Sequence, residues 1–161
     1  MIFVIIIIIL IVSLIFAIPT TDTSFHTNEV IDSVGVVVLE DYYSSGGWQD
    51  YTDYAKYYFE NPDIENNEYL THMTENDIED LIFYVDIFED WLDILPNELS
   101  SMKLIKNYDF DKSIISANDY CYIDDYTSVD PNLELETEPA SFNIYFYDIE
   151  SETLYYFHNN I

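Results

Sequence analysis

The chain of 161 residues contains no arginine and only four lysines, against 32 aspartates and glutamates, so its formal net charge is −28. A protein that grips DNA or RNA must neutralise phosphates with basic side chains. The same acidic charge repels anionic lipid headgroups and attracts cations. The composition therefore excludes nucleic acid as a partner and favours a basic protein or a cationic surface.

Cysteine is almost as scarce. Cys121 stands alone, so no disulfide can form within the chain, and small disulfide-stapled folds are excluded. Because a free cysteine is among the most buried residue types, we expect Cys121 in the core, and a disulfide dimer through this thiol is the alternative. Stability must come from packing, for which 16 Tyr, 10 Phe and two Trp are available.

The amino terminus carries the longest apolar run. Residues 2–18 are apolar except for Ser13, and they precede a polar stretch. This pattern predicts a signal peptide over residues 1–17 and a secreted product that begins near Ile18, without stable membrane association. Because 17 apolar residues can also span a bilayer, a single-pass signal-anchored membrane protein is the alternative.

Apolar spacing after the signal predicts a mainly α-helical α+β fold, a bundle of about four helices followed by a carboxyl-terminal β-hairpin. The expected helices are 29–44, 48–60, 74–95 and 97–107. The expected organisation is a disordered segment at 18–28, a helical domain at 29–129, an acidic linker at 130–140 and a hairpin at 141–161.

Two of these elements have specific signals. Thr74 and Asp77 stand at capping-box spacing, and Pro96 marks the end of the third helix. The first helix is open to another interpretation, because β-branched residues dominate the segment 34–39 and favour a buried strand there. The hairpin is predicted from two alternating segments, 142–147 and 153–158, around a turn at 148–152.

Candidate metal sites are weak. Asp109, Asp111 and Ser113 occupy the first, third and fifth positions of a calcium-loop spacing, but Ile114 and Tyr120 stand where Gly and Glu are required. We therefore expect no such loop. The surface carboxylates Asp124, Asp125 and Asp130 are the alternative, a looser and weaker site for a divalent cation. The three histidines, His26, His72 and His158, have no metal-ligand spacing. We predict no metal and no other cofactor.

Candidate catalytic residues are equally weak. Cys121, His158 and Asn159 follow the chain order of papain-like proteases, but the acidic neighbour Asp119 would raise the thiol pKa. Carboxylate pairs for glycoside hydrolysis exist in excess, and many acids must lie close by chance. We predict no catalytic residue.

Tyrosines interleaved with aspartates fill the stretches 42–43, 51–58 and 120–126. Either the rings close the core with hydroxyls outward, or they form a face for cationic or carbohydrate ligands.

Taken together, the residues predict a secreted acidic protein that binds a basic protein or cationic surface without catalysis. The alternatives are a small carboxylate-dependent hydrolase and a disordered acidic chain that folds on a partner.

Overall fold

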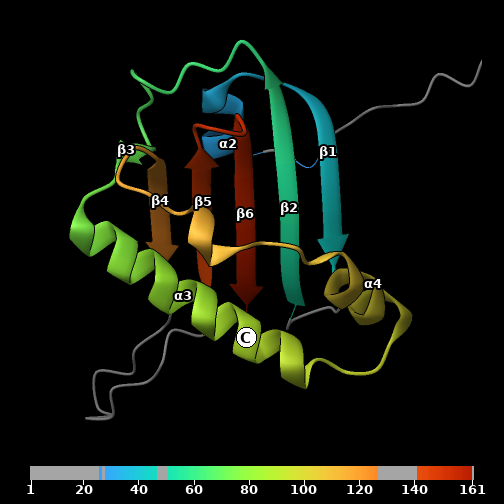
Figure 1. The fold of residues 1–161 in the computed structure, drawn as a ribbon. Helices are drawn as coiled ribbons and strands as arrows, with labels where there is room; N and C mark the ends of the chain where they lie inside the picture. The colour runs from blue at the N-terminus through green and yellow to red at the C-terminus, as the bar shows by residue number, and fades with distance from the viewer. Residues whose placement is uncertain (1–25, 27, 47–50, 127–140, 161) are drawn as a thin grey trace, which may run out of the picture.

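A computed structural model describes residues 26, 28–46, 51–126 and 141–160. This part of the chain has an α+β fold, in which one antiparallel sheet has the order β1-β2-β6-β5-β4-β3 (Figure 1). The strands are β1 (Val36–Ser44), β2 (Tyr51–Glu60), β3 (Thr71–His72), β4 (Tyr120–Asp125), β5 (Phe142–Asp148) and β6 (Thr153–Asn160). The helices are α2 (Glu29–Val34), α3 (Glu75–Ile94), α4 (Leu99–Asn107) and the short 3₁₀ turn η1 (Lys112–Ile114). The predicted mainly helical bundle is therefore wrong.

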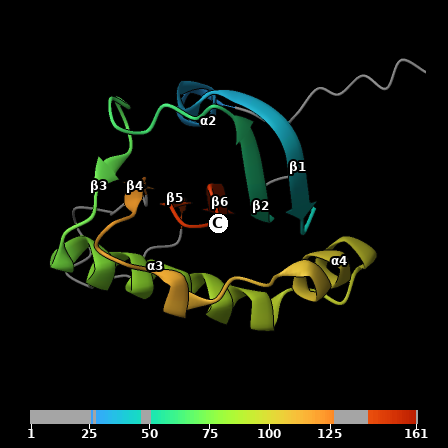
Figure 2. The same cartoon turned by 45° about the horizontal axis from the view of Figure 1, so that its top comes forward.

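The molecule has three layers (Figure 2). Helices α3 and α4 cover one face of the sheet, called here the α3 face, and α2 covers the other, called the α2 face. On the α3 face, Leu81, Val85 and Phe88 of α3 share a core with Phe146 and Phe157. A second core joins α2 to the tyrosines and leucine of the opposite face: Val30, Ile31, Val34, Tyr57, Tyr147 and Leu154.

The predicted helix 29–44 is a short helix followed by a strand. Helix α2 begins as expected at Asn28, whose side chain accepts hydrogen bonds from the backbone of Val30 and Ile31. It stops at Gly35, which has a φ of +148°, a conformation that side chains rarely allow. The β-branched residues that follow then extend as β1, so the alternative strand interpretation was nearer to the structure.

The predicted helix 48–60 is strand β2 over its described part. Tyr54 packs on the α3 face, whereas Ala55 and Tyr57 pack on the α2 face. Because helices cover both faces, apolar side chains point both ways and the polar–apolar alternation of a half-buried strand is lost. The remaining apolar pattern then imitates helical spacing.

The later elements agree with the prediction. Helix α3 has its capping box, in which the Thr74 backbone N–H donates to Asp77 and the Asp77 N–H donates to Thr74 Oγ1. Helix α4 follows Pro96, and the alternating segments form the hairpin β5–β6. This hairpin lies inside the sheet, because β6 also pairs with β2 and β5 with β4.

Several predictions fall outside the described residues: the signal peptide 1–17, the acidic linker 130–140 and most of the segment 18–28. Among the described residues, no helix has the length and apolar character needed to cross a membrane.

Candidate functional site

Helix α3 separates a buried stripe from a charged one. Its apolar residues Leu81, Val85, Phe88 and Leu92 recur every three or four positions and are buried against the sheet. The capping box fixes where the helix begins, and thereby which residues face the solvent. The opposite side of α3 consequently faces the solvent.

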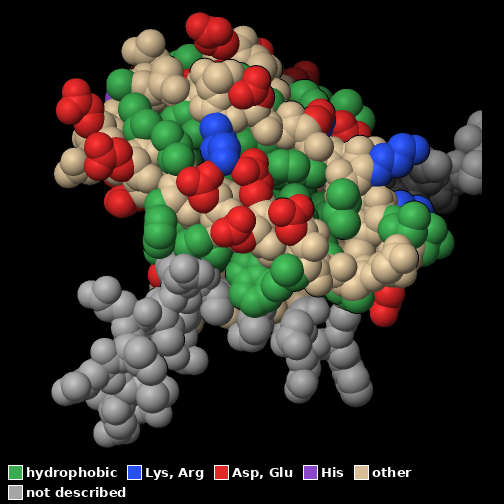
Figure 3. Space-filling view, turned by 60° about the horizontal axis from the view of Figure 1, so that its bottom comes forward, with side chains coloured by type: hydrophobic (Ala, Val, Ile, Leu, Met, Phe, Trp, Pro, Cys, Tyr) green, Lys and Arg blue, Asp and Glu red, His purple; other side chains and the backbone are tan. Residues whose placement is uncertain are grey.

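This outer side is acidic, with one aromatic ring among the carboxylates. Glu79, Phe83, Asp86, Asp90 and Asp93 are all exposed and follow one another at intervals of three or four residues, so they form a single stripe, called here the acidic face. Figure 3 shows this side of the molecule, where carboxylates are interspersed with hydrophobic side chains. Phe83 is 49% exposed.

The acidic face weakens its own helix. Asp86 and Asp90 are four residues apart, and Asp90 and Asp93 are three apart, so like charges repel along the stripe. Asp93 also lies in the last turn of α3, where the helix dipole disfavours a negative charge and where no basic residue is present. Stability of α3 therefore does not explain these carboxylates.

One lysine offsets part of this charge. Lys112 Nζ lies 2.5 Å from Asp86 Oδ1 and 2.7 Å from Glu89 Oε2, and hydrogen bonds to these two carboxylates raise the pKa of Lys112. In the described part of the chain, Glu79, Asp90 and Asp93 make no ion pair. The carboxyl-terminal half of the acidic face is thus left uncompensated.

The other lysines lie elsewhere. Lys56 on β2 pairs with Asp109 at 2.7 Å, and Lys103 and Lys106 belong to α4. Within the described part of the chain, Lys56 and Lys112 therefore form ion pairs, whereas Lys103 and Lys106 form none.

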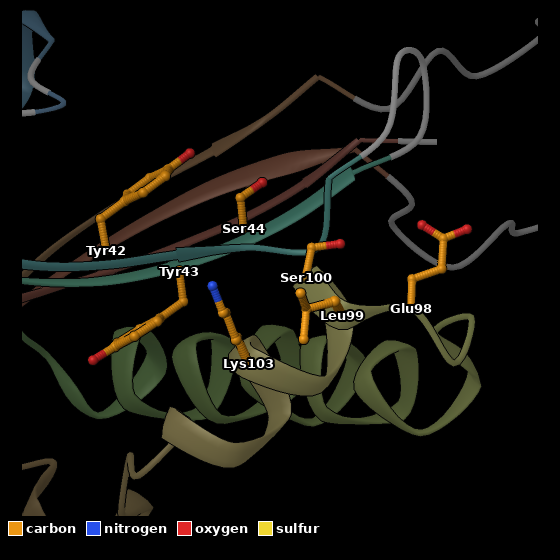
Figure 4. A pocket seen from close by; sticks show the side chains of 7 residues that line it. All are labelled: Tyr42, Tyr43, Ser44, Glu98, Leu99, Ser100 and Lys103. Atoms are coloured by element: carbon orange, nitrogen blue, oxygen red, sulfur yellow. The ribbon is translucent and has the colours of Figure 1, made fainter.

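An open pocket of about 500 Å³ lies between the end of β1 and the start of α4. Its lining comprises Tyr42, Tyr43, Ser44, Glu98, Leu99, Ser100 and Lys103 (Figure 4). Tyr42 and Tyr43 project to opposite sides of β1, and the Lys103 amine points toward the strand. The Ser100 hydroxyl is occupied, since it donates to the Ser45 carbonyl. Glu98 and Lys103 are the charged residues among those that line the pocket, and no ion pair joins them.

The residues considered for metal binding serve the fold. Asp109 accepts from Tyr54 and Lys56, and Asp111 accepts from the Ser113 backbone N–H. Asp124 and Asp125 are neighbours on β4 and therefore point to opposite faces of the sheet. Asp130 lies outside the described residues. Within the described ranges, no group of three or more His, Cys, Asp or Glu side chains could hold a metal ion.

Cys121, His158 and Asn159, which follow the chain order of papain-like proteases, do not lie together in the structure. Cys121 is on β4 and packs on the α3 face, whereas His158 is on β6 and shares the opposite face with Tyr156. Strand β5 lies between them. Asn159 points to the α3 face, where it accepts from the Thr52 hydroxyl at 2.9 Å. Burial, and then Asp77 and Asp80, raise the pKa of Cys121 to about 12.

The tyrosine-rich stretches contain both core rings and rings nearer the surface. Tyr54 and Tyr57 are core residues, whereas Tyr42, Tyr51 and Tyr126 are only partly buried or exposed. Their rings gather near Asp53 and His158 at the end of the sheet where β6 ends.

No family model, curated protein or solved structure that we compared with the chain matches it.

The apolar stripes of α3 were predicted from the sequence, but its acidic face was not. A signal was present, since the helix contains eight acids and no base. The closeness of Asp53 and His158 had no sequence signal, because it depends on the pairing of strands about 100 residues apart.

Proposed function

We propose that the protein binds a basic protein segment through the acidic face of α3, without catalysing a reaction. The observation that carries this proposal is the placement of Asp90 and Asp93, which repel each other near the end of a helix that has no base there. Side chains that reduce stability are commonly retained for function. Lysine or arginine side chains of a partner would supply the missing countercharge.

Apolar groups beside the acids indicate the character of that partner. Phe83 lies within the acidic stripe, and Ile94 at the end of α3 is 66% exposed. An aromatic ring among carboxylates favours a bound cation twice, because the ring face attracts it by a cation–π interaction and the neighbouring carboxylates attract it by their charge. A segment with basic and apolar side chains therefore fits better than a purely ionic surface.

The test measures affinity for a fluorescent lysine-rich peptide by anisotropy. We compare Asp90→Asn/Asp93→Asn with Asp63→Asn/Glu65→Gln, which removes the same charge from exposed positions in the β2–β3 loop. This loop packs with the core on the α2 face, away from α3 (Figure 2). The control therefore reports the effect of net charge alone.

We expect the α3 pair to weaken binding at least about tenfold, which is about 1.4 kcal/mol, and the loop pair to change it much less. Equal losses in the two variants would contradict a site on α3 and would point to the field of the whole molecule.

We further propose that the chain is exported before it meets this partner, which the apolar run 2–18 supports. Intact mass spectrometry of the product in the medium should give a chain that begins near Ile18. Full-length chain confined to membranes would instead support the signal anchor.

A further inference from the structure

A second polar group lies at the end of the sheet where β2 begins and β6 ends (Figure 1). Asp53 on β2 is directly opposite His158 on β6. Residues paired in this way point to the same face of the sheet, and here it is the α2 face. Asp53 is 4% exposed and His158 is 6% exposed.

Both side chains have a buried acceptor without a hydrogen-bond partner: Asp53 Oδ1 and His158 Nε2. They do not satisfy each other, because no ion pair joins them. The protein satisfies comparable carboxylates elsewhere, since buried Asp119 accepts from Ser116 and Ile149, and buried Asp148 accepts from Glu150 and Ser151. Unpaired buried acceptors reduce stability, so these two require an explanation.

The hydrogen-bond network behind His158 favours one tautomer of the imidazole. Asn143 Nδ2 donates to Asp124 at 3.5 Å, which directs Asn143 Oδ1 toward the imidazole. Oδ1 lies 2.8 Å from His158 Nδ1 and also accepts from the Tyr156 hydroxyl at 3.0 Å. The Tyr126 hydroxyl lies 3.2 Å from Nδ1 as well, and it donates to the Asn159 carbonyl at 3.4 Å. With the hydrogen on Nδ1, this nitrogen donates to Asn143 Oδ1, and Nε2 presents a lone pair. Burial lowers the pKa of His158, against the opposing charge of Asp53, so the ring is neutral near pH 7.

Aromatic rings surround this pair of acceptors. The His158 ring centroid lies 4.7 Å from that of Tyr51, 6.2 Å from that of Tyr156 and 6.4 Å from that of Tyr126. Tyr42 is also near, because its pKa is raised by burial and then by Asp53. Ring faces beside a carboxylate attract organic cations.

We propose that Asp53 and His158 bind a small organic cation, whose ammonium or guanidinium head donates one N–H to Asp53 Oδ1 and another to His158 Nε2. Such a head supplies both missing hydrogen bonds and a charge opposite to that of Asp53. A metal ion fits less well, because the described residues place no third ligand beside the pair. Tyr126, whose ring centroid lies 6.4 Å from that of His158, is 42% exposed and is the most exposed of these rings. This site is independent of the acidic face of α3.

The test is a titration of the ¹⁵N-labelled full-length protein with methylguanidinium, followed at the His158 ring nitrogens by NMR. We expect a saturable shift of Nε2, as its lone pair accepts a hydrogen bond, with little change at Nδ1. Tetramethylammonium has the same charge but no N–H, so it should leave Nε2 unchanged. An equal response to both cations, or no response to methylguanidinium, would overturn the proposal.

Variants provide a second readout by calorimetry. Asp53→Asn should bind methylguanidinium at least about tenfold more weakly, whereas Asp63→Asn, which removes the same charge from the surface, should bind as the unmodified protein does. Unchanged affinity in Asp53→Asn would also refute the site. If Asp53→Asn does not fold, the Nε2 shift of the unmodified protein still decides.

Discussion

Individual tyrosines connect the aromatic core to the acidic surface, because each places its ring in the core and its hydroxyl beside a carboxylate. The rings of Tyr54 and Tyr108 pack inside the α3-face core, and their hydroxyls donate to Asp109 and Glu89 at 2.8 Å. Burial and these carboxylates raise the pKa of both hydroxyls well above the ordinary value. The tyrosines therefore stay protonated and act as donors, which the chain needs because it has so few basic side chains.

His158 should make stability depend on pH. Its pKa in the folded protein lies below the ordinary value of 6.5, so the unfolded chain binds this proton first as the pH falls. The free energy of unfolding should consequently decrease from about pH 6.5 downward and level off below the folded pKa. His158→Gln lacks this contribution.

The measurement is the melting temperature of both proteins across this pH range. The melting temperature of the unmodified protein should fall relative to that of His158→Gln as the pH falls. A pH-independent effect of the substitution on the melting temperature does not alter this trend. A pH-independent difference would show that His158 has the same pKa in the folded and unfolded chains.

Cys121 should be inert while the protein is folded. The thiol is 5% exposed, and its raised pKa of about 12 leaves almost no thiolate near neutral pH. We expect a thiol reagent to label Cys121 slowly in buffer and rapidly in urea. Non-reducing electrophoresis should show a monomer, whereas a reducible dimer would support the alternative of disulfide pairing.

At the scale of elements, predictability followed the strength of local sequence signals, because β5 and β6 were predicted although both are buried on both faces. Helix α3 and the alternating strands of the hairpin could be predicted from a capping box, a proline and a clear period. Strand β1 was predicted only as an alternative, and β2 was not predicted, because its apolar spacing resembles that of a helix and its partner β6 lies about 100 residues away. The pairing of Asp53 with His158 depends on the same register, so no local pattern could predict it.

The acidic face of α3 should oppose stability and support binding. In Asp90→Lys/Asp93→Lys, the repulsion within α3 disappears and positive charge interacts favourably with the end of the helix. Each effect contributes some tenths of a kcal/mol, so we expect the free energy of unfolding in urea to rise by about 1 kcal/mol at low salt. The same variant should lose its affinity for the lysine-rich peptide.

The corresponding lysine substitutions at Asp63 and Glu65 are the control, because they change the net charge equally outside any helix. A similar gain in that control would attribute the stabilisation to net charge. A loss of stability in the α3 variant would show that Asp90 and Asp93 stabilise the fold.

At the scale of the whole molecule, a net charge of −28 opposes compaction, while the sheet and its two cores favour it. Salt separates the two contributions, because it screens charges and leaves the buried cores largely unaffected. The Debye length falls from about 30 Å at 0.01 M to about 10 Å at 0.1 M, which is shorter than most distances between surface charges across the molecule.

We therefore expect a cooperative thermal transition by near-ultraviolet circular dichroism, with a melting temperature at least about 3 °C higher at 0.1 M than at 0.01 M NaCl. The signal reports the ordered tyrosine rings of both cores. A melting temperature that does not depend on salt would show that core packing outweighs the repulsion between carboxylates even when salt does not screen it. No transition at either salt concentration would mean that the chain does not fold alone, and the basic partner proposed for α3 would then be needed for folding as well as for function.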